Sequence, residues 1–229
     1  YAAATQTIPT INILLYRLIP DTDVRKAWWL DENAYSPLLE KVSWDGVTGK
    51  DRASLVIEDV KEPYLPYNTV KFGMKSGCGS VLCNNDWPLM RVEEMILIKA
   101  EGLIKSGKAA EGEKVMTDFI KNYRDPKYVR STGRSLENEV WFQRRVELWG
   151  EGFFTADAKR LGKPIVRIHA DKKSNYPDAF QFNIKADDGW LNMRFPQTEK
   201  DNNKAIVDNI GGAQPEPGQY PELRDGVTD

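Results

Sequence analysis

The sequence is poor in the features that mark nucleic-acid-binding, membrane-spanning and metal-dependent proteins. Its 32 Lys and Arg nearly balance its 34 Asp and Glu, whereas a nucleic-acid-binding domain needs a basic excess. No apolar run approaches the roughly 20 residues that span a bilayer as a helix. His169 is the one histidine, and the two cysteines lack the C-x2-C spacing of a zinc site. We therefore expect no nucleic-acid partner, no metal and no other cofactor.

Two features bear on the compartment and on processing. Cys78 and Cys83 can form a short disulfide in an oxidising compartment, or they can remain free thiols, and both alternatives stay open. The chain begins at Tyr1 with no Met, no basic region and no apolar leader segment, so we expect a fragment or a processed product.

Helical periodicity is clear in residues 86–122. Asp86 can cap a first helix, Ser106-Gly107 is a stop signal, and a second helix follows over 109–122. Two helices joined by a tight glycine turn are typical of a tetratricopeptide-like unit. The predicted apolar stripe is Leu89, Val92, Met95, Ile96, Ala100 and Leu103 on the first helix and Val115, Met116, Phe119 and Ile120 on the second, with Ala100 and Ala110 near the crossing.

A second helical pair is predicted after a polar linker. Ser135 can cap a third helix, and Gly150 and Gly152 separate it from a short fourth helix. We predict that residues 86–122 and 135–161 form two antiparallel helical pairs packed on each other.

The rest of the chain lacks sustained periodicity. Short apolar runs at 11–19 and 54–60 have the length of strands or short helices, and the residues after Pro164 are loop-like. The predicted fold is mainly α, with tetratricopeptide-like helical hairpins, long irregular loops and a few short strands. The predicted parts are a loop-rich segment with candidate ligand-binding aromatics (1–85), a helical core of two hairpins (86–162) and an irregular segment packing on the helices (163–229).

Three segments carry ordered motifs. PLMRVEEMILIKAEGLIKSG (88–107) contains an R-x-x-E-x-x-L-x-x-A-E pattern, followed by Gly102. RRVELWGEGFFTADAKRLG (144–162) contains R-R-x-E-L-x-x-E-G and then D-x-x-R. MRFPQTEKDNNKAIVDN (193–209) contains P-x-x-E-x-x-x-N and then a final Asn. In this order the three segments resemble the SusD/RagB family, in which an Ala is usual at the position of Gly102.

The resemblance implies a glycan-binding outer-membrane lipoprotein of a polysaccharide-utilisation system, exposed at the cell surface and active in nutrient uptake. Such proteins are not enzymes, and they deliver oligosaccharides or polysaccharides to a TonB-dependent, SusC-like transporter. Family members are longer and carry a lipidated cysteine in their N-terminal part. The resemblance therefore implies that this chain is a C-terminal portion, attached to the membrane only through an anchor outside it.

The charged motif residues have two interpretations. Glu147 and Glu151 lie one helical turn apart and could form a general acid/base pair, as in glycoside hydrolysis. Mixed-sign charges on one helix face more commonly pair with each other, and several arginines are close in sequence. We favour the structural interpretation, with no catalytic residue, for Arg91, Glu94, Glu101, Arg144, Arg145, Glu147, Glu151, Asp157 and Arg160.

Aromatic residues in loop-like segments are the predicted glycan contacts. The chain has seven Trp and nine Tyr, and an exposed ring can stack on a pyranose while a neighbouring carboxylate accepts hydroxyl bonds. Burial in the core is the alternative for each ring. A helical protein-interaction scaffold without its own sugar site is the alternative function. The candidates are Trp44, the best single choice, with Asp45, Tyr35, Tyr64, Tyr67 and Trp190.

Overall fold

The computed structural model describes residues 9–38, 43–44, 47–48, 65–72, 89–209 and 211–229. The chain divides into two compact units, Tyr1–Glu151 and Gly152–Asp229. The predicted mainly helical class is confirmed, and strand is confined, within the described ranges, to a two-stranded hairpin and isolated bridges. No helix in the described part of the chain is long and apolar enough to cross a membrane.

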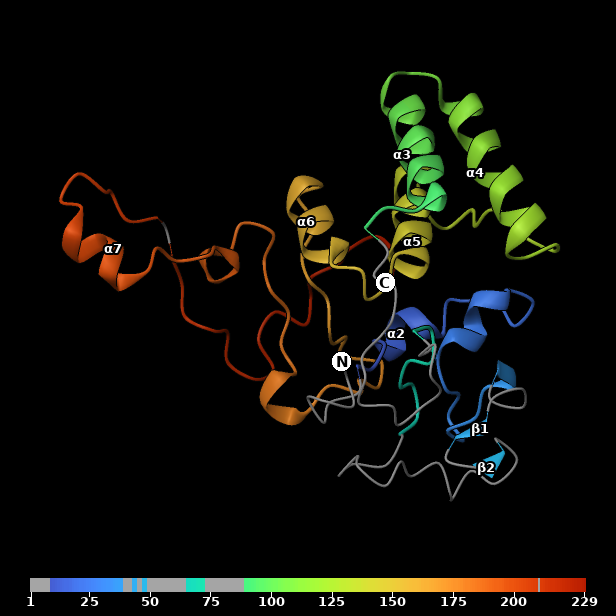
Figure 1. Cartoon of the computed structure of the whole chain (residues 1–229), viewed down its shortest axis with the longest axis horizontal. Helices are drawn as coiled ribbons and strands as arrows, with labels where there is room; N and C mark the ends of the chain where they lie inside the picture. The colour runs from blue at the N-terminus through green and yellow to red at the C-terminus, as the bar shows by residue number, and fades with distance from the viewer. Residues whose placement is uncertain (1–8, 39–42, 45–46, 49–64, 73–88, 210) are drawn as a thin grey trace. The chain divides into compact units, whose positions relative to one another are not determined.

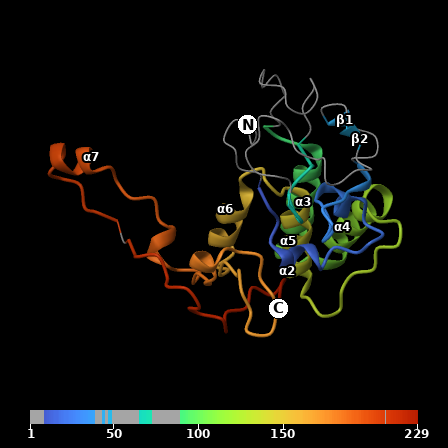
Figure 2. The same cartoon turned by 90° about the horizontal axis from the view of Figure 1, so that it is seen from below.

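A helical hairpin is the main feature of the first unit. α3 (Val92–Lys105) and α4 (Ala109–Tyr123) lie side by side in Figures 1 and 2 and are joined by a turn at the predicted stop signal. In this turn Gly107 has a φ of 84°, a left-handed conformation that favours glycine. The buried cluster of the hairpin and its neighbours comprises Leu97, Ala100, Met116, Phe119, Ile120, Tyr128 and Val140.

Gly112 allows the two helices to approach closely. A Cβ atom built on Gly112 would lie 2.6 Å from the carbonyl oxygen of Ala100 and 2.6 Å from Cγ1 of Ile104. Of the two small residues predicted at this crossing, Ala100 is fully buried, whereas Ala110 is exposed. Positions two apart on a helix do not share a face, so Ala110 cannot take the place of Gly112.

The buried face of α3 differs from the predicted stripe. Leu97 and Ala100 are fully buried, and α3 packs against both α4 and a third helix, α5 (Leu136–Glu147). Apolar residues occupy more than one side of α3, so its packing partners, and not the residue spacing, decide which side is buried. The residues of the predicted stripe that are exposed are Leu89, Val92 and Met95.

The helix α5 starts at the predicted position, whereas α3 starts later in the chain than predicted. α5 begins where predicted, because the Ser135 Oγ accepts a hydrogen bond from the Asn138 amide at 3.2 Å. α3 begins at Val92 and not near Asp86, which lies outside the described residues. Its N-cap residue, Arg91, makes no side-chain capping bond. The free backbone amides at the start of a helix need an acceptor, and an arginine side chain has only donors.

The predicted glycine break after α5 is confirmed. Gly150 has a φ of 78° and Gly152 a φ of 88°. The helix that follows, α6 (Phe153–Arg160), belongs to the second unit, so the predicted second hairpin is divided between the two units. The predicted three-part division of the chain stays a prediction.

Short elements complete the first unit. The run at 11–19 contains the helix α2 (Ile13–Tyr16), and the 3-10 helix η1 (Val24–Trp28) precedes the buried Trp29. β1 (Ser43–Trp44) pairs antiparallel with β2 (Val47–Thr48). The apolar run at 54–60 and both cysteines lie outside the described residues.

The second unit is mostly irregular, as predicted for its C-terminal part. Asn183, fully buried, holds it together: its Oδ1 accepts from the amides of Arg167 and Ile168 at 2.7 and 3.0 Å, and its Nδ2 donates to the carbonyl of Tyr220 at 2.8 Å. An antiparallel bridge between Ile165 and Ile184 reinforces this contact. Besides α6, the regular elements are η4 (Asp178–Phe180), η5 (Gly189–Leu191) and α7 (Gln197–Asn202).

Candidate functional site

Glu147, the last residue of α5, lies at the centre of a cluster of buried charges. Its side chain is fully buried, and both of its oxygens accept hydrogen bonds from arginines. Oε1 lies 3.1 Å from Nη1 of Arg91 and 2.9 Å from Nη2 of Arg124. Oε2 lies 2.8 Å from Nε of Arg124 and 3.4 Å from Nη1 of Arg25. Three guanidinium groups therefore surround one carboxylate.

Glu151 extends the cluster through Arg91 and Lys71. The Arg91 guanidinium binds Glu151 at two atoms, Nε to Oε2 at 3.0 Å and Nη2 to Oε1 at 2.8 Å. Lys71 Nζ donates to Glu151 Oε1 at 2.6 Å and to the carbonyls of Glu147 and Trp149 at 2.8 and 2.9 Å. Lys71 and Arg91 thereby hold the last turn of α5 and the glycine break in one conformation.

The two carboxylates are ionised at neutral pH. Burial alone would raise the pKa of Glu147, but the hydrogen bonds and charges of its arginines outweigh burial and lower that pKa. The same balance, with Arg91 and Lys71 as partners, lowers the pKa of Glu151. A general acid must be protonated before it reacts, so this pair is poorly suited to glycoside hydrolysis. The geometry favours the structural interpretation.

A chain of hydrogen bonds links this cluster to the middle of α5. Arg25 Nη2 donates to Gln143 Oε1 at 2.6 Å, and Gln143 Nε2 donates to Glu139 Oε1 at 2.9 Å. Tyr128 and Arg134 donate to Glu139 at 3.0 and 2.6 Å. The same Nη2 of Arg25 also donates to Asp23 Oδ2 at 2.6 Å. Buried polar groups that are satisfied in this way define a single arrangement of the surrounding segments.

The structure brings together only some of the predicted signature residues. Arg91, Glu147 and Glu151 converge, whereas the half-buried Glu101 pairs with Lys105 one turn further along α3 at 2.9 Å. Arg145 stacks on Trp141 at 4.9 Å. Of the remaining signature residues, Glu94 is half-buried on α3, Arg144 is buried on α5, and Asp157 and Arg160 form an ion pair at 2.8 Å in the second unit.

Sequence reasoning missed three partners of the cluster: Arg25, Lys71 and Arg124. They lie in segments without a motif. Arg25 and Arg124 are 122 and 23 positions from Glu147, and Lys71 is 80 positions from Glu151, so the spacing of residues cannot indicate these contacts. The sequence instead favours Arg144, Arg145 and Arg160 as partners, because these arginines lie near Glu147 in the chain. A basic residue with no acidic neighbour in the sequence is a weak signal, and it could have drawn attention to Lys71 only, because Asp23 is close to Arg25 and Asp125 follows Arg124.

Each aromatic candidate that the structure describes has its own surroundings. Tyr67, half-buried with a φ of 69°, packs edge-on against Tyr16 at 5.1 Å. Trp190, also half-buried, packs edge-on against the buried Phe182 at 5.8 Å. The backbone of Trp44 pairs with Val47 in the β1–β2 hairpin. Tyr35 is half-buried, and its backbone amide donates a hydrogen bond to Asp31 Oδ1 at 2.9 Å. Asp45, Tyr64 and the side chain of Trp44 lie outside the described residues.

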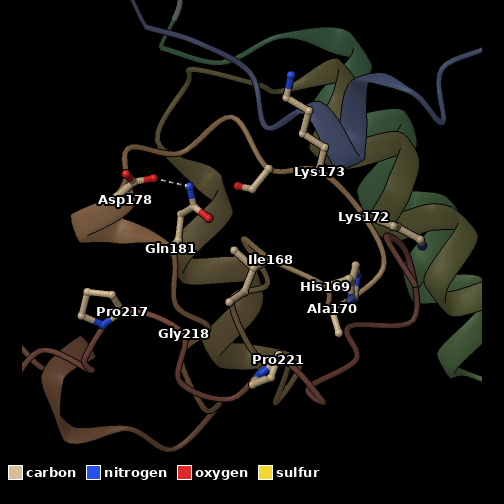
Figure 3. A pocket seen from close by; sticks show the side chains of 11 residues that line it. Ile168, His169, Ala170, Lys172, Lys173, Asp178, Gln181, Pro217, Gly218 and Pro221 are labelled. Atoms are coloured by element: carbon tan, nitrogen blue, oxygen red, sulfur yellow. Dashed lines mark hydrogen bonds between the residues drawn. The ribbon is translucent and has the colours of Figure 1, made fainter.

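The second unit contains an open hollow of about 800 Å³ that sequence reasoning did not identify (Figure 3). Two segments far apart in sequence form it, 168–181 and 217–221, so no local pattern marks it. Figure 3 shows Asp178 and Gln181 on one side of the hollow, and the side chains of Lys172 and Lys173 leading away from it on the other side. Lys172 Nζ donates to the carbonyl of Thr228, which is not among the lining residues, at 3.0 Å. Ile168, Pro217 and Pro221 supply apolar surface to the lining.

Comparison with known proteins identifies the family. The sequence model of the SusD family matches residues 26–216, which is more than half of the chain. A comparison with curated proteins and a comparison with solved structures each found no match. The matched range includes Arg91, Glu147 and Glu151 of the buried cluster and the first of the two segments that form the hollow. The chain belongs to the SusD family, whose members are glycan-binding proteins.

Proposed function

We propose that this protein binds an oligosaccharide or polysaccharide at the cell surface and delivers it to a TonB-dependent, SusC-like outer-membrane transporter. The observation that carries the proposal is the family match over residues 26–216. SusD family proteins are in general non-catalytic glycan-binding proteins associated with the outer-membrane surface. Membrane attachment through a lipidated N-terminal segment is part of the proposal.

The geometry supports binding without catalysis. Glu147 and Glu151 resemble a hydrolytic pair in spacing, but each of their oxygens accepts a bond from a cation of the protein. Their role in the proposal is to hold the end of α5 against the segments that carry Arg25, Lys71 and Arg91. Glycan contact is assigned to loop aromatics, with Trp44 the first choice, and to polar surface hollows.

Affinity electrophoresis tests the proposal directly. The folded chain is run in native gels that contain one polysaccharide each, from a panel of neutral and acidic plant, algal and microbial polymers. Retardation by at least one polymer, relative to a non-binding reference protein, is the expected result. If no polymer of the panel retards the folded chain, the proposed glycan binding is wrong.

The second candidate is a helical protein-interaction scaffold, and the exposed face of α3 favours it. Val92 and Ile98 are 71% and 46% exposed, and Leu89, just before the helix, is 88% exposed. Such apolar side chains suit a protein contact. Capture of the chain by a detergent extract containing the transporter, with no retardation by any polysaccharide, would support this candidate over glycan binding.

A further inference from the structure

The hollow in the second unit is lined on one side by hydrogen-bond acceptors. Gln181 Nε2 donates to the Tyr176 carbonyl and to Asp178 Oδ1, both at 3.0 Å. These two bonds use both N–H groups of the amide and fix its orientation, so its Oε1 is left for a ligand. Figure 3 shows this oxygen turned into the hollow, close to the Asp178 carboxylate. A ligand in the hollow therefore meets an amide oxygen and a carboxylate together.

Ser174 adds a third acceptor to the lining, and hydrogen bonds hold the backbone around it. The Ser174 Oγ donates its proton to the Arg167 carbonyl at 3.0 Å and accepts from the Tyr176 amide at 3.2 Å, which leaves one acceptor site of the hydroxyl for a ligand. The Gly218 amide donates to the Gln181 carbonyl at 2.7 Å, which joins the two lining segments. Acceptors that are held in place in this way lose little entropy when a ligand binds.

The basic side chains of the lining are turned away from the hollow or are bonded elsewhere. Figure 3 shows the side chains of Lys172 and Lys173 leading away from it, and Lys172 Nζ donates to the Thr228 carbonyl at 3.0 Å. Both ring nitrogens of His169 have partners: Nε2 lies 3.0 Å from the same carbonyl, and Nδ1 lies 3.2 Å from Nη1 of Arg224. The side chains that face the hollow thus offer acceptors, and the ligand must supply the donors.

The charge of the ligand follows from the same groups. An acidic ligand group that accepted no hydrogen bond here would lie against the Asp178 carboxylate, and like charges at short range repel each other. An ammonium group would gain from Asp178, but the two lysines of the lining outnumber this one carboxylate and oppose a further positive charge. Hydroxyl groups donate hydrogen bonds to Asp178 and Gln181 without either cost. The lining therefore favours an uncharged ligand that is rich in hydroxyl groups.

We infer that this hollow is a subsite for an uncharged sugar unit of the bound glycan. Asp178 and Gln181 accept hydrogen bonds from neighbouring hydroxyl groups of the ring. Ile168, Pro217 and Pro221 contact its C–H surface. The volume of about 800 Å³ is within the range of ligand pockets. The inference rests on the proposed glycan binding and specifies its ligand class.

The test runs the full chain in native gels that contain galactan, mannan or β-glucan, which are uncharged, or polygalacturonate or alginate, which are acidic. We expect the strongest retardation from an uncharged polymer. Asp178→Asn should weaken that retardation about tenfold in apparent affinity, the size expected for loss of one charge-assisted contact. The matched control is Asp201→Asn on α7. Asp201 is exposed, lies outside the lining and accepts a bond from Gln197 Nε2 at 2.7 Å, much as Asp178 does from Gln181.

A second variant tests the amide acceptor. Gln181→Met, which is similar in size and has no amide, should weaken the same retardation, and Asp178→Asn carries the test if a melting curve shows that this variant does not fold. Equal retardation of Asp178→Asn and Asp201→Asn would overturn the subsite while leaving glycan binding intact. Stronger retardation of the wild-type chain by polygalacturonate or alginate than by every uncharged polymer would also overturn it. Failure of the whole polysaccharide panel would instead remove the proposed function.

Discussion

The carboxylate of Glu147 lies 3.1 Å from the guanidinium of Arg91, although 56 positions separate the two residues in the chain. The same carboxylate binds Arg124, the C-cap of α4, and Arg25 of η1. One side chain at the end of α5 thereby connects four segments of the first unit. The motif positions Arg91 and Glu147 owe their pairing to the way in which α3 packs on α5.

Glu147→Gln should destabilise the protein strongly. The amide carries no charge, so Arg25, Arg91 and Arg124 keep only their second carboxylate partners, which are Asp23, Glu151 and Glu93. Breaking a buried ion pair costs up to about 3–5 kcal/mol. Thermal unfolding should show a large drop in melting temperature, while the folded variant, below its melting temperature, should still be retarded by any polysaccharide that retards the wild-type chain. Glu137→Gln, at an exposed position of the same helix, is the control and should unfold like the wild type. Loss of binding with unchanged stability would contradict the structural role.

His169 should make the protein less stable in mild acid. Burial, followed by the charges of Lys172 and Arg224, lowers the pKa of His169 below its ordinary 6.5. The unfolded chain therefore binds a proton at a higher pH than the folded chain does. As the pH falls below about 6.5, the unfolded state gains protons first and the free energy of unfolding decreases.

Urea unfolding at about pH 7.5 and about pH 5.5 checks this, since only the lower value is below the ordinary histidine pKa. His169→Gln removes the titrating group, and the loss of stability between the two pH values should be smaller in the variant. An identical loss in both proteins would show that other groups cause the acid sensitivity.

Two glycines in the α3–α4 hairpin should respond to alanine in opposite directions. Gly112→Ala places a methyl group 2.6 Å from the Ala100 carbonyl, and a backbone atom cannot move aside cheaply, so we expect a loss of about 1–3 kcal/mol. The Cβ atom added by Gly102→Ala has no neighbouring atom within 4 Å. At this exposed helical position alanine should stabilise the protein by about 0.5–1 kcal/mol. Urea unfolding of both variants measures the difference. If both variants lost the same amount of stability, the close approach of α3 and α4 at Gly112 would be ruled out as the cause.

Trp44→Ala should weaken glycan binding without lowering the melting temperature. Loss of one stacked ring costs about 1 kcal/mol, so the effect on a titration followed by tryptophan fluorescence should be several-fold. Trp190→Ala is the comparison: its ring packs on the buried Phe182, and its loss should lower stability. An unchanged titration for Trp44→Ala together with a large drop in melting temperature would identify Trp44 as a core residue.

Local chemistry made several features of the fold predictable. Ser135 caps α5, and Gly107 ends the α3 hairpin turn, because a capping oxygen or a left-handed glycine acts on its immediate neighbours. Met116, Phe119 and Ile120 form the buried face of α4 as predicted, since its other faces are polar. The same reasoning failed for α3, whose apolar residues occupy several faces.

The sequence by itself determined the helical class, the family and most helix ends, since these depend on residue types at short spacing. Only the tertiary structure decided which side of α3 is buried and which cations surround Glu147. It also brought Asp178 and Gln181 into one hollow with Pro217 and Pro221. These features depend on contacts between segments that are distant in the chain, and no pattern of neighbouring residues encodes such a contact, because the packing of whole elements creates it.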